Sequence, residues 1–162
     1  MSSAFVIDPP PVVSLPVTGD TRRFAVNRIY CVGRNYADHA REMGHDPDRE
    51  PPFFFMKPAN SIVTDGKDMA YPNLSKDVHH EIEMVVAIGK GGANISADKA
   101  LEHVYGYGVG LDMTRRDLQG EAKKMGRPWD TGKAFDQAAP CGEITPVTKC
   151  GHPAKGAVKL LV

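Results

Sequence analysis

Short apolar runs separated by glycine, proline and polar turns recur along the chain, and this pattern predicts strands more often than helices. The segment 78–88 is rich in apolar and β-branched residues and ends at a glycine-rich turn, so it reads as a strand. The other predicted strands cover residues 24–32, 53–57, 61–63, 105–113, 143–147 and 157–162. A chain built mainly from such runs is expected to form a mixed β fold with short α-helices.

Polar start signals and glycine stop signals mark three short helices between these strands. They cover residues 35–44, 97–104 and 114–125. In the last of these, Thr114 and Asp117 have the spacing of a capping box, and Gly126 stands where a left-handed residue would end the helix. Because residues 1–23 are irregular and rich in proline, we expect an N-terminal arm there and one domain over residues 24–162.

Glu81 and Glu83 are the most informative residues because they lie two positions apart in the predicted strand 78–88. Side chains alternate between the faces of a strand, so these carboxylates would share a face, about 7 Å apart. Adjacent carboxylates repel each other unless they share a proton or a cation, and oxygen ligands select a hard ion such as Mg²⁺ or Mn²⁺. The alternative interpretation is the solvated face of an antiparallel strand, where paired acids are common.

Further polar residues follow in the next third of the chain. Asp112 ends a glycine-rich strand, where its carboxylate would either complete a metal site or cap the following helix. Arg116, Gln119 and Lys123 are spaced i, i+3 and i+7, so they would share one helix face. That face suits the oxygens of a substrate carboxylate, or it is simply solvated. Lys133 lies in a predicted loop, where its cation could neutralise charge developing on a reacting oxygen or merely face solvent.

Histidines near these carboxylates are candidates for proton transfer. His39 and Glu42 are spaced i, i+3 on a predicted helix, and an imidazole oriented by a carboxylate can activate water near neutral pH. The alternative is an ordinary pair on the surface of a helix. His79 shares the strand face of the two glutamates, so its side chain could contact the metal ligands and orient them, although it is no convincing metal ligand itself.

Composition excludes several classes of function. Twenty basic and twenty acidic side chains balance, which argues against a nucleic-acid partner or an anionic membrane. The longest apolar runs are too short to span a membrane, and the first residues lack the features of a secretory signal. Three cysteines without a C-x-x-C motif are typical of free thiols in a reducing cytoplasm.

Seven motifs, taken together and in order, resemble those of the fumarylacetoacetate hydrolase superfamily. They are residues 30–36, His39 with Glu42, 54–58, 80–83, 106–107, 112–119 and 132–135. This resemblance covers residues 28–147 and implies a β-roll with short flanking helices, usually as a homodimer. Family members continue for several more strands, so we expect the roll to lack its C-terminal strands, with residues 156–162 as the first strand of the missing part.

The resemblance also implies a metal site and a means of activating water. Glu81, Glu83 and Asp112 match the positions that bind magnesium or manganese in the family. His39, with Glu42 beside it, matches the pair that activates water from a segment that closes over the site.

Four further positions match those that the family uses around its substrate: Arg34, Arg116, Gln119 and Lys133. Lys57 matches a family lysine for which a structural role and a catalytic role are equally consistent with the sequence.

These implied roles predict metal-dependent hydrolysis of a carbon–carbon bond in an acylpyruvate, which is a small diketo acid. Residues 39–55 most resemble bacterial family members that convert 3-fumarylpyruvate into fumarate and pyruvate in gentisate-type aromatic degradation. Oxaloacetate decarboxylation and isomerisation of a ring-cleavage product are alternatives on the same site, because both stabilise an enolate. An alternative from another class is a truncated metal-binding remnant without activity.

Overall fold

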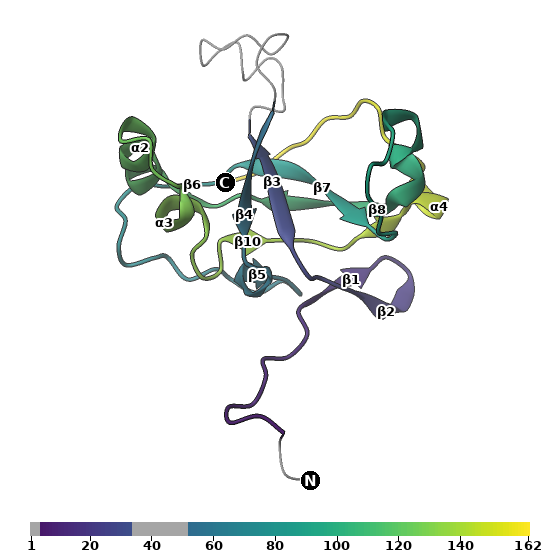
Figure 1. Ribbon diagram of the computed structural model, residues 1–162, viewed down its shortest axis with the longest axis horizontal. Helices are drawn as coiled ribbons and strands as arrows, with labels where there is room; N and C mark the ends of the chain where they lie inside the picture. The colour runs from purple at the N-terminus through teal and green to yellow at the C-terminus, as the bar shows by residue number, and fades with distance from the viewer. Residues whose placement is uncertain (1–3, 34–51) are drawn as a thin grey trace.

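The computed structural model describes residues 4–33 and 52–162, and its strands form several small sheets (Figure 1). The largest sheet within these ranges has the strand order β11-β8-β7 and consists of β7 (Ile82–Ile88), β8 (Val104–Leu111) and β11 (Thr145–Pro146). The two-stranded sheets pair β1 (Ser14–Val17) with β2 (Asp20–Ala25), β3 (Ile29–Gly33) with β4 (Phe53–Lys57), β5 (Ile62–Val63) with β10 (Ala139–Pro140), and β6 (Val78–His79) with β9 (Thr114–Arg115).

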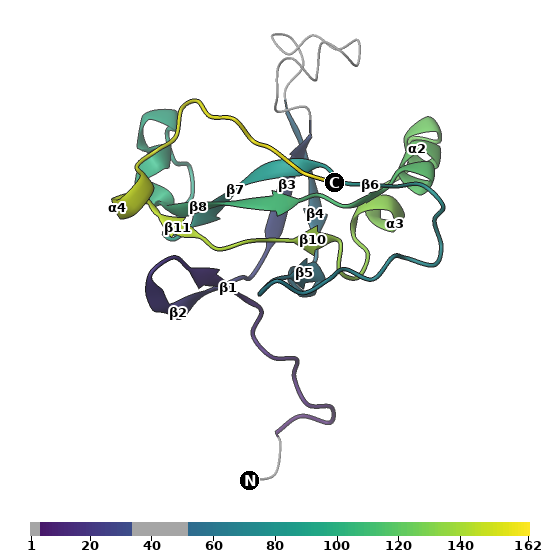
Figure 2. The ribbon, with the colours of Figure 1, turned by 180° about the vertical axis from the view of Figure 1, so that it is seen from behind.

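The helices are short and lie at opposite ends of the molecule. Figures 1 and 2 show α2 (Arg116–Lys124) and α3 (Asp130–Lys133) together at one end and α4 (Val147–Cys150) at the other. Two 3₁₀ helices, η1 (Ala59–Ser61) and η2 (Ala97–His103), complete the described elements. In the ranges that the structure describes, no helix has both the length and the apolar character to cross a membrane. The predicted mixed β fold with short helices is confirmed.

The antiparallel pair of β7 and β8 forms the centre of the fold. Glu83 lies opposite Gly110 in this pair, and inward-facing Ala87 is only 5% exposed. Beyond the paired strands, the backbone N–H of Asp112 donates a hydrogen bond to the backbone oxygen of Glu81, at 2.8 Å. Two segments far apart in the sequence therefore bring two acidic side chains to the same end of the sheet.

The main apolar cluster joins the start, middle and end of the chain. Leu15 from β1, Ala87 from β7 and Ile144 before β11 are buried against one another. The backbone N–H of Ile144 donates to Pro16 O at 2.9 Å, so the β1–β2 hairpin is fastened to this cluster. The boundary predicted after residue 23 therefore falls inside a hairpin whose first strand belongs to the core.

Three strand predictions are wrong. Residues 78–88 form two strands, because β6 pairs with β9 whereas β7 pairs with β8, and Glu81 lies between the two. Residues 24–32 are not one buried strand, because β2 pairs with β1 whereas β3 pairs with β4, and the chain leaves the ladder between them. Residues 156–162 form no strand, and Leu161 is 97% exposed. A strand needs a ladder partner for its backbone groups, and the described part of the chain supplies none here.

The helix predictions are partly correct. α2 ends near Gly126, whose φ of 63° confirms the expected left-handed stop. Its start is not the predicted capping box, because Thr114 lies in β9 and Asp117 instead accepts a hydrogen bond from Ser75 Oγ at 2.7 Å. The predicted helix 97–104 is the 3₁₀ helix η2, and the predicted helix 35–44 lies outside the described residues.

Candidate active site

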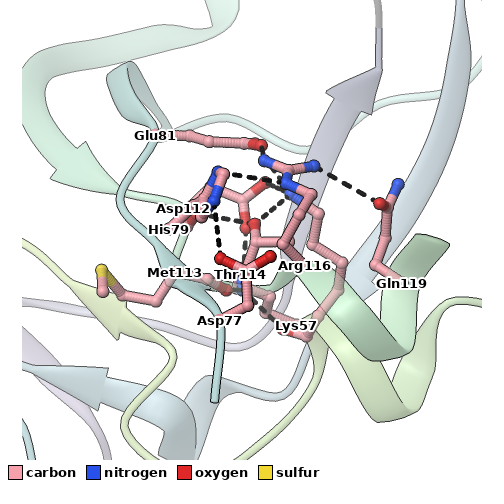
Figure 3. Close-up of polar contacts among 10 residues, drawn as sticks. Lys57, Asp77, His79, Glu81, Asp112, Met113, Thr114, Arg116 and Gln119 are labelled. Atoms are coloured by element: carbon pink, nitrogen blue, oxygen red, sulfur yellow. Dashed lines mark hydrogen bonds and ion pairs between the residues drawn. The ribbon is translucent and has the colours of Figure 1, made fainter. Parts of the chain in front are cut away.

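The candidate site lies where β7 and β8 meet α2 and α3 (Figure 3). Glu81 directly precedes β7 and Asp112 directly follows β8, and the hydrogen bond between their backbones makes them neighbours. The side chain of Glu81 is 30% exposed and that of Asp112 is 9% exposed. One carboxylate therefore faces solvent in part while the other is buried, which places the site at the boundary of the interior.

Lys133 connects the two carboxylates through a single ammonium group. Its Nζ lies 2.8 Å from Glu81 Oε2, 2.7 Å from Asp112 Oδ2 and 2.6 Å from Thr114 Oγ1. The Thr114 hydroxyl donates to the backbone oxygen of Asp112, so it accepts the hydrogen bond from Lys133. Lys133 lies in α3 rather than in the predicted loop, and only 4% of its side chain is exposed. The buried ammonium of Lys133 is therefore a counter-charge shared by Glu81 and Asp112.

A second buried ammonium lies behind Asp112. Lys57 Nζ forms an ion pair with Asp112 Oδ1 at 2.8 Å and donates to the backbone oxygens of Met113 and Lys133. Asp112 Oδ1 is buried and receives no hydrogen bond of good geometry from the described residues. Burial lowers the pKa of Lys57, and the charge of Asp112 opposes that shift. Lys57 therefore ties β4 to the ends of β8 and α3, which favours the structural role among those that its sequence allows.

Arg116 and Gln119 face the site from α2, as their i, i+3 spacing predicts. Arg116 Nη2 donates to Glu81 Oε1, and Nη1 donates to Gln119 Oε1 at 3.4 Å. Lys123, the third member of the predicted stripe, is exposed. Although burial opposes ionisation of Glu81, the cations of Lys133 and Arg116 lower the pKa of its carboxyl group below the ordinary value. Glu81 is thus held in its charged form.

The metal assignment stays a prediction. Glu83 is half-buried in β7, whereas Glu81 lies between β6 and β7, so the two glutamates do not belong to one strand as predicted. In residues 4–33 and 52–162, no three carboxylate, imidazole or thiol side chains converge on one point as metal ligands would. The structure brings Glu81 and Asp112 onto one cation, that of Lys133.

Three of the predicted site residues, Arg34, His39 and Glu42, lie outside the described residues. Their proposed roles in binding substrate and activating water stay predictions.

The sequence interpretation missed an aromatic group beside Lys133. Lys133 Nζ lies 5.1 Å from the ring centroid of Phe55, whose ring lies 5.8 Å from that of Trp129. Phe53 packs edge-on against Trp129, with 5.1 Å between centroids. The sequence could have indicated part of this group, because side chains alternate along a strand and residues 53, 55 and 57 of β4 must share a face.

Gly132→Ala is expected to lower both stability and activity. The added Cβ would lie 2.8 Å from the backbone nitrogen of Gln119, so α3 must move away from α2 and carry Lys133 with it. We expect the free energy of unfolding, measured in urea, to fall by about 1–3 kcal/mol. Gly120→Ala is the matched control, because its Cβ meets no atom within 4 Å apart from the backbone of its own helix, and alanine favours the helix. Equal losses in the two variants would contradict the packing argument.

Comparison with known proteins gives a consistent result. The family model described as "Fumarylacetoacetate (FAA) hydrolase C-terminal" matches residues 28–162. The crystal structure of fumarylpyruvate hydrolase from Pseudomonas aeruginosa in complex with Mn²⁺ and pyruvate is 55% identical, with a TM-score of 0.88. That match covers 92% of this chain and 66% of the other chain.

Two curated relatives carry different activities in their names. A fumarylpyruvate hydrolase from Ralstonia is 48% identical over 107 residues, which are 65% of this chain and 56% of the relative. An oxaloacetate tautomerase from Caenorhabditis elegans is 41% identical over 131 residues, which are 81% of this chain and 61% of the relative. The chain thus spans little more than half the length of either curated relative.

Proposed function

The chain belongs to the fumarylacetoacetate hydrolase family, and on that premise we propose that it hydrolyses a carbon–carbon bond in an acylpyruvate with the help of a divalent metal ion. The proposed substrate is 3-fumarylpyruvate, cleaved to fumarate and pyruvate. One observation carries this proposal: two carboxylates at the end of the central sheet converge on a single cation, with Arg116 and Gln119 beside them. Its support comes from the similarity to a hydrolase that binds Mn²⁺ and pyruvate.

The residues present fit a hard divalent ion. Glu81 and Asp112 already direct one oxygen each at the same ammonium, and Asp112 Oδ1 pairs with the Lys57 ammonium but receives no hydrogen bond of good geometry from the described residues. Carboxylate oxygens are the ligands that Mg²⁺ and Mn²⁺ prefer. We propose that Glu81, Glu83 and Asp112 hold the ion, which when bound supplies a Lewis acid to the oxygens of the pyruvyl group.

The chain's own residues would carry the remaining chemistry. Arg116 and Gln119 present N–H donors to the substrate oxygens from α2. His39, oriented by Glu42, would take a proton from water as its oxygen bonds to the acyl carbonyl carbon. The bond between that carbon and the pyruvyl methylene then breaks, and its electron pair passes to the pyruvate enolate. Lys133 would stabilise the enolate charge through its ammonium, and the proton that His39 took from water would pass to the methylene carbon to complete pyruvate.

Oxaloacetate tautomerisation is the second candidate function. The relative from Caenorhabditis elegans is named for this activity, and its match covers more of this chain than that of the Ralstonia hydrolase. Interconversion of keto and enol forms needs the same stabilised enolate but no bond cleavage. Identification of the reaction products therefore distinguishes hydrolysis from tautomerisation. A homodimer, a cytoplasmic location and a place in aromatic degradation stay predictions from the sequence.

Product analysis tests the proposal. The purified protein with Mn²⁺ is expected to release fumarate and pyruvate from 3-fumarylpyruvate, with kcat/KM at least about tenfold above that for acetylpyruvate or oxaloacetate, a difference of about 1.4 kcal/mol in transition-state binding. Chelation of the metal should abolish turnover, and added Mn²⁺ should restore it. Interconversion of oxaloacetate tautomers without cleavage of fumarylpyruvate would favour the second candidate, and Mn²⁺ binding without any turnover would favour the remnant.

A further inference from the structure

Polar contacts through Asp77 and His79 lead from the surface to Arg116 (Figure 3). Asp77 and His79 have no role in the chemistry described above. Arg116 Nε donates to His79 Nδ1 at 3.3 Å, and His79 Nε2 lies 2.9 Å from Asp77 Oδ1. The backbone supports this arrangement, because β6 pairs with β9 and Arg116 N donates to Asp77 O at 2.7 Å. Asp77, His79 and Arg116 are therefore held together by side-chain and backbone contacts at once.

The partners of His79 define the role of each ring nitrogen. Arg116 Nε always carries a hydrogen, so Nδ1 must accept. Nε2 then carries the hydrogen and donates to the Asp77 carboxylate. With its lone pair directed at Arg116, His79 is neither a base for water nor a metal ligand. His79 is instead a hydrogen-bond acceptor for the guanidinium of Arg116.

Arg116 needs such support because its side chain is long and must hold one orientation. Its guanidinium contacts three side chains along different edges, namely His79 at Nε, Glu81 at Nη2 and Gln119 at Nη1. Glu81 and Gln119 contact only the two terminal nitrogens, so His79 supplies the restraint at the third edge of the guanidinium, at Nε. An acceptor at Nε fixes that plane, because the N–H groups of arginine form a rigid fork.

We propose that His79, oriented by Asp77, is a positioning residue that holds the Arg116 guanidinium in place for the carboxylate of a pyruvyl group. This rests on the proposed function, in which Arg116 binds substrate oxygens. Loss of the acceptor would weaken binding of the substrate and its transition state alike, so KM should rise while kcat changes little.

Two substitutions at one position test the proposal. His79→Leu removes the acceptor, whereas His79→Asn can place a carbonyl oxygen near the position of Nδ1. We expect His79→Leu to raise KM for fumarylpyruvate about tenfold with kcat changed less than about threefold, and His79→Asn to recover most of the loss. Asp77→Ala should raise KM in the same direction by a smaller factor. His80→Leu, at the exposed next position, is the matched control and should behave as wild type.

A binding measurement separates this inference from the proposed function. The Kd of pyruvate for the Mn²⁺-loaded protein, measured by calorimetry, should rise about tenfold in His79→Leu and recover in His79→Asn. If the wild type binds pyruvate but cleaves nothing, the proposed hydrolysis fails while this measurement still decides the role of His79. An unchanged Kd in His79→Leu, equal weakening in the Leu and Asn variants, or a fall in kcat without a rise in KM would each overturn the inference.

Discussion

Lys133→Met should lower kcat by about two to three orders of magnitude while the protein binds Mn²⁺ at least as tightly as before. Its ammonium contacts both Glu81 and Asp112, and it is almost fully buried. In the metal-free protein this charge neutralises the carboxylates that a divalent ion must use. Its removal therefore takes away a competitor for the metal, and it also takes away the cation that would stabilise the enolate.

Steady-state kinetics at saturating Mn²⁺ and calorimetric titration with Mn²⁺ measure the two effects separately. Lys149→Met is the matched control, because its exposed ammonium donates only to the backbone oxygen of Thr18 among the contacts described. A Lys133→Met protein with near-normal kcat would contradict the catalytic role. A marked loss of Mn²⁺ affinity would contradict the competition between the ammonium and the metal.

Asp112→Asn should abolish Mn²⁺ binding and lower the free energy of unfolding by about 3–5 kcal/mol. The Asp112 carboxylate faces the ammonium groups of Lys57 and Lys133 at 2.8 and 2.7 Å, and all three side chains are buried. A neutral amide leaves the two cations without their common counter-charge in the interior. Urea denaturation in the presence of a chelator measures the loss of stability, and calorimetry measures the loss of metal.

A double variant distinguishes buried charge from general damage. Lys133 keeps its ion pair with Glu81, so Lys57 is the cation that Asp112→Asn leaves without an acidic partner among the described contacts. Adding Lys57→Met removes that cation, so part of the lost stability should return while Mn²⁺ binding stays absent. Asp65→Asn breaks an exposed pair with Arg23 and should cost less than about 1 kcal/mol. Normal Mn²⁺ affinity in Asp112→Asn, or a double variant less stable than the single one, would contradict the interpretation.

Local sequence patterns were sufficient for the strands that carry the site. Apolar runs with clear turn signals predicted β4, β7 and most of β8, because each has a face that must be buried. They were not sufficient where the chain changes partner. Residues 24–32 read as one strand because nothing local marks the point at which pairing passes from β1 to β4.

The side-chain partners at the site could not be read from spacing alone. Glu81 and Asp112 become neighbours through the register of β7 and β8, and Lys133 reaches them only because α3 packs closely on α2 at Gly132. These are tertiary relations between segments many residues apart. The i, i+3 pair Arg116 and Gln119 could be predicted because a helix places such residues on one face.

The three cations around the carboxylates have a consequence for the charge of the substrate. Lys57, Lys133 and Arg116 balance the three proposed ligands Glu81, Glu83 and Asp112, so this part of the site is close to neutral before a metal enters. A divalent ion then adds two positive charges in a partly buried setting. A dianion such as fumarylpyruvate restores neutrality, whereas an acylpyruvate with one carboxylate does not. The metal and a dianionic substrate should accordingly strengthen each other's binding. The site would therefore select substrates by their net charge.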